Sequence, residues 1–512
     1  MAISSTVQSV KVRMYRQGFG DCFLLSFYRE HERIFTMLID CGIKHNTKSD
    51  SAPIEDVIAD LKSTLTMAGK TKPQLDVLVA THEHWDHVAY FHPKRFPDFF
   101  ADFEIGQVWL AWTENPEDKE ASTINSRLRQ GAAALQFAAT QLRDSTQSEV
   151  TQAGDMHFGF SLKQGRDEFN QKLDDMLGFY GVTSLKKVSE SGIEYKPNGS
   201  VSTMTEQAMQ RIVELGKNGG GIKYFSPGTT IDNQLLPSGV NVYVLGPPRN
   251  SLINKSDPSS GSNQETYLSI DQCGMTSFVD GILGLAAAHG TANANNSSPF
   301  GDKIGVDRQD AEKEPFFENT YLAPKEAYRK IDHNWLDLAG QFALQLDGAI
   351  NNTSLVLAIE LADSSKVMLF PGDAQVGSWL SWHDHKWEVR DGVNIKTRNA
   401  EDLLKNTVLY KVSHHGSHNA TVKDKGLELM THPELVAMIP EKEDSYSGIP
   451  YEPLLERLQR ICKGRVLVSA DVNFPPEKLQ TDRPAELSTT EWESFKNNLI
   501  IDRLYVEYTV HS

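Results

Sequence analysis

The feature that most constrains this chain is a polar motif that directly follows an apolar run. Residues Leu75–Ala80 are rich in Val and Leu, which predicts a buried β-strand. The run leads straight into Thr81-His82-Glu83-His84-Trp85-Asp86-His87. Because side chains two apart on an extended chain point the same way, the imidazoles of His82 and His84 should face one point.

Asp86 and His87 follow where the chain should begin a helix, and we expect them to face a second point close by. Imidazole nitrogens with one carboxylate suit Zn²⁺, and also Fe or Mn. The alternative is a surface loop that happens to contain several His. Three His and one Asp straight after a buried strand favour a metal site. The motif is not the zinc-protease helix HExxH, because Asp stands at position 86 in place of the second His.

Short apolar runs rich in β-branched residues predict β-strands on both sides of a polar middle part. In the first part these runs are Val10–Tyr15, Phe23–Phe27, Ile34–Ile39 and Gly106–Trp112, with an amphipathic helix over Ile54–Met67. The later runs are Val240–Leu245, Ser354–Leu361, Lys366–Phe370, Val408–Val412, Leu435–Ile439, Arg465–Ser469 and Leu504–Tyr508. Strands interrupted by helices suit a sandwich of two sheets with helices outside.

Two polar segments, residues 113–236 and 250–349, interrupt this pattern. We interpret both as largely helical insertions into one domain that spans residues 1–512. The elements predicted inside them are helices near Ile124–Asp144, Met204–Gly216 and Trp335–Leu346, and a glycine-rich loop over Lys217–Lys223.

Together with three further elements, the motif His82-x-His84-x-Asp86-His87 resembles the signature of the metallo-β-lactamase superfamily. The further elements stand in that superfamily's order and are Leu38-Ile39-Asp40-Cys41-Gly42, Leu369-Phe370-Pro371-Gly372-Asp373 and Lys411-Val412-Ser413-His414-His415-Gly416-Ser417. The resemblance implies an α/β protein with an αββα sandwich and a dinuclear metal centre.

Within that superfamily the chain most resembles the hydrolase domain of the ComEC-type competence proteins and their soluble relatives. The elements that carry this likeness are Gly18-Phe19-Gly20-Asp21, Val244-Leu245-Gly246-Pro247 and Asn351-Asn352-Thr353-Ser354-Leu355-Val356. The resemblance covers residues 9–112, 236–248 and 350–475. The membrane segments of those proteins have no counterpart here, so DNA transport is not implied.

The resemblance implies a ligand set for two divalent ions, with Zn²⁺ or Mn²⁺ expected. The first ion would be held by His82 and His84, and the second by Asp86, His87 and His414, with Asp373 as a bridge. A water between the ions would lose a proton near neutral pH and attack an electrophilic centre, and Asp86 would also orient that water. For Asp373 the alternative is an ordinary turn residue.

Other residues near these motifs have two interpretations each. His415 is expected either to contact a substrate oxygen or to lie on the surface. Asp21 and Asp40 would each orient a metal-bound His by hydrogen bonding, or would cap a turn, and Asp40 has the better claim from its place in the motif order. His383 and His385 look like a metal pair, but we expect them on a helix, where residues two apart do not face each other.

Many members of the superfamily supply a third His to the first ion, and its source is open here. Val244–Pro247 stands where that element belongs and contains no His. The intervening candidates are His157, His289 and His333. His289 is the best of them, although its apolar neighbours favour a packed core histidine equally.

The chain is acidic, with a formal net charge of −17 at pH 7. That charge argues against a broad nucleic-acid-binding surface, because phosphate contacts need Lys and Arg. The sequence has no apolar run long enough to span a membrane and no secretory signal at its N-terminus. Cys22, Cys41, Cys273 and Cys462 show no CxxC spacing, which suits a reducing compartment, so we expect a cytoplasmic protein.

Two metal ions roughly 3.5–4 Å apart suit an in-line displacement, so a phosphodiester in a nucleic acid or nucleotide is the expected substrate. It would enter beside His415 and Ser417. The same centre also supports a carbon-centred hydrolase that acts on a thioester, lactone or lactam. A third reading is a metal-bearing binding or regulatory protein, whose insertions dock a protein partner or a second copy.

Overall fold

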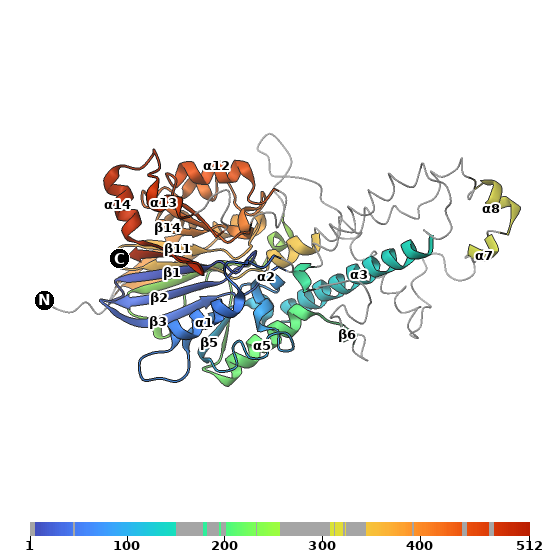
Figure 1. Ribbon diagram of the computed structural model, residues 1–512, viewed down its shortest axis with the longest axis horizontal. Helices are drawn as coiled ribbons and strands as arrows, with labels where there is room; N and C mark the ends of the chain where they lie inside the picture. The colour runs from blue at the N-terminus through green and yellow to red at the C-terminus, as the bar shows by residue number, and fades with distance from the viewer. Residues whose placement is uncertain are drawn as a thin grey trace.

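The computed structural model describes residues 6–44, 47–149, 178–181, 194–195, 201–231, 233–256, 308–311, 313–320, 323, 345–391, 394–442, 448–469 and 476–512. In this part the chain has a mixed α/β structure with two large sheets (Figure 1). Strand β1 pairs along its full length with the last strand, β18, so both ends of the described chain lie in one sheet.

The eight-stranded sheet has the order β17-β18-β1-β2-β3-β4-β5-β8. Neighbours from β17 to β3 are antiparallel, whereas β3, β4, β5 and β8 run parallel to one another. Its strands are Ser9–Tyr15 (β1), Phe23–Arg29 (β2), Glu32–Ile39 (β3), Gln74–Val79 (β4), Glu104–Ala111 (β5), Ile222–Phe225 (β8), Leu499–Ile501 (β17) and Tyr505–His511 (β18).

The six-stranded sheet has the order β16-β15-β14-β11-β10-β9. Its strands are Val240–Gly246 (β9), Val356–Leu361 (β10), Lys366–Phe370 (β11), Thr407–Lys411 (β14), Val436–Ile439 (β15) and Val466–Val468 (β16). β11, β14, β15 and β16 run parallel. The motif residues therefore follow the carboxyl ends of β3 and β4 in one sheet and of β11 and β14 in the other.

Alternate residues along the strands pack into different layers, as expected for strands buried on both faces. In β9, Val242 and Val244 belong to a core cluster that joins the two sheets, whereas Tyr243 and Leu245 belong to a cluster on the outer face. The central cluster takes residues from both sheets, including Phe23 of β2, whose ring lies 5.8 Å from that of Phe370 of β11.

Helices cover both outer faces (Figure 1). Those on the eight-stranded sheet are Ile54–Leu65 (α1), Trp85–Val88 (α2) and Met204–Asn218 (α5), and those on the six-stranded sheet are Val376–Trp382 (α10), Ala400–Lys405 (α11) and Glu452–Ile461 (α12). Helix α3, Lys119–Glu149, projects from this body. The remaining elements are Glu194–Tyr195 (β6), Val201–Ser202 (β7), Arg308–Ala311 (α7), Pro315–Thr320 (α8), Lys386–Asp391 (β12), Asn394–Asn399 (β13), Lys478–Thr481 (α13) and Thr489–Asn497 (α14), with 3₁₀ turns at Ala89–Phe91 (η1), Trp112–Glu114 (η2), Gly178–Tyr180 (η3), Asn233–Leu235 (η5), Ser251–Asn254 (η6), Ser413–Gly416 (η8) and Leu427–Leu429 (η9).

Most strands predicted from the sequence are confirmed to within two or three residues, and two predictions need correction. The expected loop Lys217–Lys223 is wrong at both ends, because α5 continues to Asn218 and Ile222 begins β8, which pairs with β5 at the edge of the large sheet. Within the segment interpreted as the first insertion, α5 and β8 thus extend the sheet and its helical layer. His383 and His385 do not lie on a helix, because α10 ends at Trp382. The predicted helix Trp335–Leu346 lies mostly outside the described residues.

Candidate metal centre

The histidine-rich motif forms a bend between β4 and the short helix α2. β4 ends at Val79, and His84 is the residue before the first turn of α2. The side chains of His82, His84, Asp86 and His87 are at most 1% exposed. A surface loop that happens to be rich in His is therefore the wrong interpretation of this motif.

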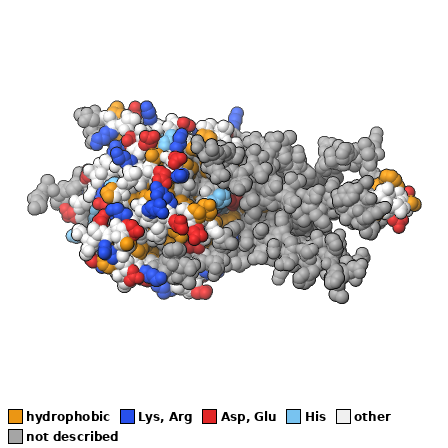
Figure 2. All heavy atoms as spheres, turned by 90° about the horizontal axis from the view of Figure 1, so that it is seen from above, with side chains coloured by type: hydrophobic (Ala, Val, Ile, Leu, Met, Phe, Trp, Pro, Cys, Tyr) orange, Lys and Arg blue, Asp and Glu red, His pale blue; other side chains and the backbone are white. Residues whose placement is uncertain are grey.

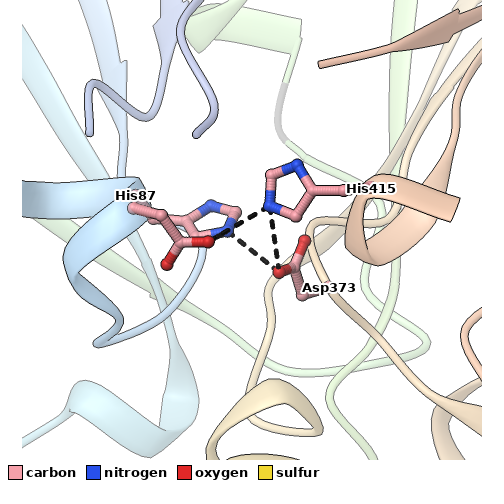
Figure 3. A group of neighbouring side chains, drawn as sticks. His87, Asp373 and His415 are labelled. Atoms are coloured by element: carbon pink, nitrogen blue, oxygen red, sulfur yellow. Dashed lines mark hydrogen bonds and ion pairs between the residues drawn. The ribbon is translucent and has the colours of Figure 1, made fainter. Parts of the chain in front are cut away.

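Four side chains from two sheets form a closed group, which we call the four-residue group (Figure 3). It consists of Asp86, His87, Asp373 and His415, whose ligand atoms all lie within 4.8 Å of one another. His87 Nε2 lies 3.8 Å from Asp86 Oδ2 and 3.1 Å from Asp373 Oδ2. His415 Nε2 lies 3.1 Å from Asp86 Oδ2 and 3.9 Å from Asp373 Oδ2. Imidazoles and carboxylates thus alternate around a small ring.

These distances fit a metal ion. Four ligands at about 2.0–2.1 Å from a tetrahedral Zn²⁺ lie about 3.3 Å apart, close to the separations in this group. Within the described part of the chain, the buried atom Asp86 Oδ1 has no hydrogen-bond partner, and His87 Nε2 and Asp373 Oδ2 form an ion pair at 3.1 Å without hydrogen-bond geometry. Buried polar atoms without partners are rare in native proteins, and a bound ion is one ordinary reason for them.

Asp40 holds the ring of His87 in one orientation. Asp40 Oδ2 lies 2.8 Å from His87 Nδ1. Asp40 is itself fixed by Thr81, whose backbone N donates to Oδ1 at 2.7 Å and whose Oγ1 donates to Oδ2 at 2.6 Å. A proton on Nδ1 leaves the Nε2 lone pair of His87 directed at the four-residue group.

The contact between Asp40 and His87 requires the backbone after β3 to lie very close to the backbone of α2. A Cβ on Gly42 would lie 2.2 Å from the carbonyl carbon of Asp86, so only glycine allows the end of β3 to lie against α2. Asp40 adopts a left-handed conformation, with φ 57°, just before this point. Asp21 is the other residue expected to orient a metal-bound His, and its Oδ2 lies 3.7 Å from His87 Nδ1.

Burial and neighbouring charges shift the pKa values of His87 and Asp373 in opposite directions. Burial alone lowers the pKa of His87, but the carboxylates of Asp373, Asp21, Asp86 and Asp40 raise it well above its usual range. Burial alone raises the pKa of Asp373, but His87 and Lys411 lower it well below its usual range.

His415 belongs to the four-residue group, in the place that the sequence interpretation gave to His414. His415 is fully buried, so its interpretation as a surface residue is wrong. Its Nδ1 donates to the carbonyl of Pro440 at 2.5 Å, and its Nε2 faces Asp86 Oδ2 at 3.1 Å. Its ring also packs on Phe19, with centroids 4.1 Å apart.

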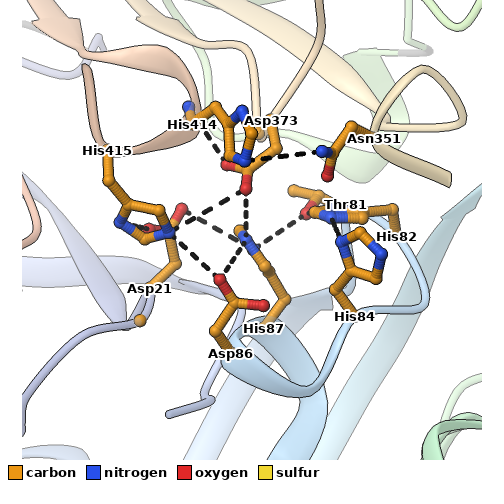
Figure 4. A network of polar contacts seen from close by, with 12 residues as sticks. Asp21, Thr81, His82, His84, Asp86, His87, Asn351, Asp373, His414 and His415 are labelled. Atoms are coloured by element: carbon orange, nitrogen blue, oxygen red, sulfur yellow. Dashed lines mark hydrogen bonds and ion pairs between the residues drawn. The ribbon is translucent and has the colours of Figure 1, made fainter. Parts of the chain in front are cut away.

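His414 lies beside Asp373, to whose Oδ1 its backbone N donates at 3.2 Å, but its ring does not join the four-residue group (Figure 4). His414 and His415 both have left-handed φ values, 47° and 52°, so the backbone turns sharply and the ring centroids lie 6.3 Å apart. His414 Nε2 lies 3.4 Å from Asn351 Nδ2, and its Nδ1 has no hydrogen-bond partner among the described residues.

Lys411 is a charged member of the centre that the sequence reasoning missed. Its ammonium lies 2.6 Å from Asp21 Oδ2 and 3.1 Å from Asp373 Oδ1, and it donates to the carbonyl of Gly372 at 2.9 Å. The side chain is 1% exposed. The one signal in the sequence was a lysine at the end of a strand that is otherwise apolar.

His82 and His84 form a second, smaller unit, which we call the histidine pair (Figure 4). His82 Nε2 lies 3.1 Å from His84 Nδ1. Among the described residues, neither joins a third potential ligand in a group whose atoms all lie within 4.8 Å of one another. The three histidines considered as a third ligand, His157, His289 and His333, lie outside the described residues.

The other residues singled out from the sequence lie outside both units. Ser417 Oγ donates to Asn419 Oδ1 at 3.0 Å. His383 Nε2 lies 2.8 Å from the carbonyl of Lys425, and the ring of His385 lies beside Trp387, with centroids 6.0 Å apart.

On the molecular face in Figure 2, Lys and Arg side chains are interspersed with Asp and Glu rather than gathered in one area. Of the helices that the structure describes, none combines the length and the apolar character needed to cross a membrane. Comparisons with protein-family models and with curated proteins find no match for this chain.

Proposed function

We propose that this chain is a dinuclear metal-dependent hydrolase of the metallo-β-lactamase superfamily, and that its substrate is a phosphodiester. The observation that carries this proposal is the four-residue group, in which two imidazoles and two carboxylates from separate sheets converge at ligand distances. The histidine pair lies beside it, with the ring centroids of His82 and His87 4.2 Å apart.

The arrangement of layers supports the superfamily assignment. Two sheets share a central apolar cluster, and helices cover both outer faces. The ligands follow the carboxyl ends of β4, β11 and β14, in the chain order that the motif resemblance implies. We take this as the αββα sandwich, carrying its metal centre at one edge of the two sheets.

The four-residue group would hold one ion, and the histidine pair would hold the other, with Asp373 shared between them. Bound divalent ions would supply Lewis acidity and lower the pKa of a water molecule toward neutrality. Zn²⁺ or Mn²⁺ suits this mixture of imidazole and carboxylate.

The chain's own residues would then position the reactants. Asp86 contacts His415 through Oδ2, while Oδ1 is buried and has no hydrogen-bond partner in the described part of the chain. Oδ1 is thus available to accept a proton from an attacking water. Lys411 occupies Oδ1 of Asp373 and directs Oδ2 toward His87.

The charge of the centre favours an anionic substrate. The carboxylates of Asp21 and Asp373 face the cation of Lys411, and those of Asp40 and Asp86 lie beside His87, whereas burial raises the pKa of Asp347 to about 8. Two divalent ions would give the centre a small net positive charge. A phosphodiester matches that charge better than a neutral ester, and a short strand or nucleotide suits the mixed surface charge better than long duplex DNA.

A metal-reconstituted assay tests the proposal. After chelation, Mn²⁺ or Zn²⁺ should restore cleavage of a bis-aryl phosphate and of short oligonucleotides. Asp86→Ala should lower that rate by roughly 10²–10⁴-fold, whereas Asp384→Ala, at an exposed position, should leave it unchanged. Turnover of a thioester or lactone with both phosphodiesters intact would instead assign a carbon-centred hydrolase. No turnover and little bound metal would assign a binding protein.

A further inference from the structure

Three of the candidate metal-binding histidines share a pattern at the ring nitrogen that faces away from the centre. In His87 this nitrogen is Nδ1, which meets Asp40 Oδ2 at 2.8 Å. In His415 it is Nδ1, which meets the carbonyl of Pro440 at 2.5 Å. Metal-binding histidines in proteins almost always donate this second N–H to an acceptor, which fixes the tautomer and the ring orientation.

His82 follows the same pattern. Its Nδ1 lies 3.0 Å from Thr81 Oγ1 and 3.2 Å from Ser354 Oγ. Its other nitrogen, Nε2, is the one that faces His84 Nδ1 at 3.1 Å. If both of these nitrogens bind one ion, both must present lone pairs, so His84 must carry its proton on Nε2.

His84 Nε2 is buried and has no hydrogen-bond partner among the described residues. A carboxylate faces it: Asp347 Oδ1 lies 3.8 Å away and likewise has no hydrogen-bond partner in the described ranges. A buried N–H left without an acceptor costs about 1–3 kcal/mol. A side-chain movement of about 1 Å would bring these two atoms into hydrogen-bond contact.

The surroundings hold Asp347 in this direction. Its Oδ2 accepts a hydrogen bond from Asn351 Nδ2 at 3.0 Å, one helical turn later, which leaves Oδ1 for His84. The next residue, Asn352, ties this turn to the body, because its Nδ2 donates to the carbonyl of Lys255 at 2.9 Å and its Oδ1 accepts from Gln375 N at 3.1 Å.

Aromatic rings enclose the same space. The centroids of Phe179 and Tyr180 each lie 5.7 Å from that of His84. The side chain of Asp347 is only 16% exposed. Water therefore has limited access to His84 Nε2.

We propose that Asp347 is a positioning residue that accepts the Nε2–H of His84 and so directs Nδ1 toward the ion shared with His82. This inference rests on the proposed metal centre. Asp347 lies in the segment interpreted as the second insertion, outside the parts of the chain that carry the superfamily resemblance. That segment would then be a working part of the metal centre.

Metal binding to the full chain tests this role without reference to activity. Titration of chelator-treated protein with Zn²⁺ should show two bound ions in the wild type. Asp347→Ala should weaken one of them by about 10- to 100-fold and leave the other unchanged. Asp347→Asn keeps an oxygen acceptor, so its affinity for that ion should fall less than the affinity of Asp347→Ala does. The control is Asp310→Ala, in the same segment, where the carboxylate is 70% exposed and pairs only with Lys313 among the described residues.

A second measurement reads the tautomer directly. In ¹⁵N-histidine spectra of the Zn²⁺-bound protein, the wild type should show His84 protonated at Nε2, and Asp347→Ala should shift or broaden that resonance. Two ions bound with unchanged affinity in Asp347→Ala would overturn the inference. Loss of one ion in Asp347→Asn as complete as in Asp347→Ala would also overturn it, because it would make Asp347 a direct ligand.

The outcomes separate this inference from the proposed function. A wild type that binds two ions but cleaves no phosphodiester would refute the proposed substrate class. The metal affinity of Asp347→Ala would then still decide whether Asp347 positions His84. A wild type that binds no ion would refute both.

Discussion

The two adjacent histidines after β14 show how much a single backbone conformation decides. In an extended chain, neighbouring side chains point to opposite sides, and the sequence alone could not say which ring faces the centre. The left-handed conformations of His414 and His415 turn the chain so that only His415 reaches Asp86.

This difference gives a direct test at the residue scale. His415→Ala should remove the ion held by the four-residue group, because the remaining ligands cannot replace the lost bond. His414→Ala should retain that ion, since its ring lies outside the group. Metal content after dialysis, measured by elemental analysis, checks both variants. Retention of metal in His415→Ala together with its loss in His414→Ala would return the ligand role to His414.

Lys411 provides a second test at this scale. The variant Lys411→Met should lower the free energy of unfolding by roughly 3–5 kcal/mol in metal-free protein, because it leaves buried carboxylates without their partner. Added Mn²⁺ should recover part of the loss by neutralising the same carboxylates.

Lys366→Met is the matched control for that experiment. Lys366 also pairs with a carboxylate, at 2.8 Å from Glu434, but that carboxylate is 59% exposed. An exposed ion pair contributes about 0–1 kcal/mol, so this variant should unfold almost as the wild type does. Equal losses in both variants, as judged by denaturant titration, would show that Lys411 has no special role.

The candidate site was predictable from the sequence where its residues lie next to each other in a motif. His82, His84, Asp86 and His87 share one bend, and all are buried there. Lys411 and Asp347 were not predictable, because each contacts the centre through tertiary packing. Nothing local marks a lysine that ends a strand or an aspartate one turn before Asn351 as part of a distant group.

At the scale of elements, strands buried on both faces were the easiest to predict. β9 and β11 are continuous apolar runs and were found almost residue for residue. The hairpin β12–β13 was missed, because its sequence alternates charged residues with few apolar ones. β8 was missed because it is short and follows a glycine cluster, and its place at the edge of the sheet comes from pairing with β5.

Arg129 of α3 contacts Glu83 of the histidine-rich motif, and a buried carboxyl beside them predicts how the stability of the protein depends on pH. Glu114, in η2, lies near Glu83 and Arg129, and burial together with the charge of Glu83 raises its pKa to about 7. A carboxyl whose pKa is raised by folding binds more protons in the folded state between its unfolded and folded pKa values. Its stabilising contribution is therefore full below about pH 4.5 and is lost as the pH rises through about 7.

Replacing Glu114 should reveal this dependence. Glu114→Gln stays neutral, so its melting temperature should fall less than that of the wild type between pH 5 and pH 8. Glu117→Gln, three residues away and exposed, should follow the wild type. Parallel pH profiles for Glu114→Gln and wild type, measured by thermal denaturation, would contradict the assigned pKa.

At the scale of the whole molecule, the four-residue group joins the two sheets. Asp86 and His87 follow β4 of the eight-stranded sheet, whereas Asp373 and His415 follow β11 and β14 of the six-stranded sheet. An ion bound between them should therefore stabilise the packing of one sheet against the other.

Metal removal tests this coupling. Ligand binding to the folded state alone adds about 4 kcal/mol when the free ion is present at 1,000 times its dissociation constant. Chelation should lower the melting temperature, and Mn²⁺ or Zn²⁺ should restore it in proportion to the logarithm of the ion concentration. Asp373→Asn should show a smaller response to either ion. If neither the chelator nor the added ion changed the melting temperature, no metal ion would bind between the two sheets.

The separation of the ligands along the chain also sets an order of events during synthesis. Asp86 and His415 are 329 residues apart. At roughly 5–20 residues per second, a ribosome needs roughly 15–65 s to add the second after the first. Asp21, Asp40 and His87, which form a group of their own, emerge early and together. The nascent chain thus carries a cluster of acidic groups without its later partners until β11 and β14 have been made, and an ion bound by the four-residue group could be captured only after that point.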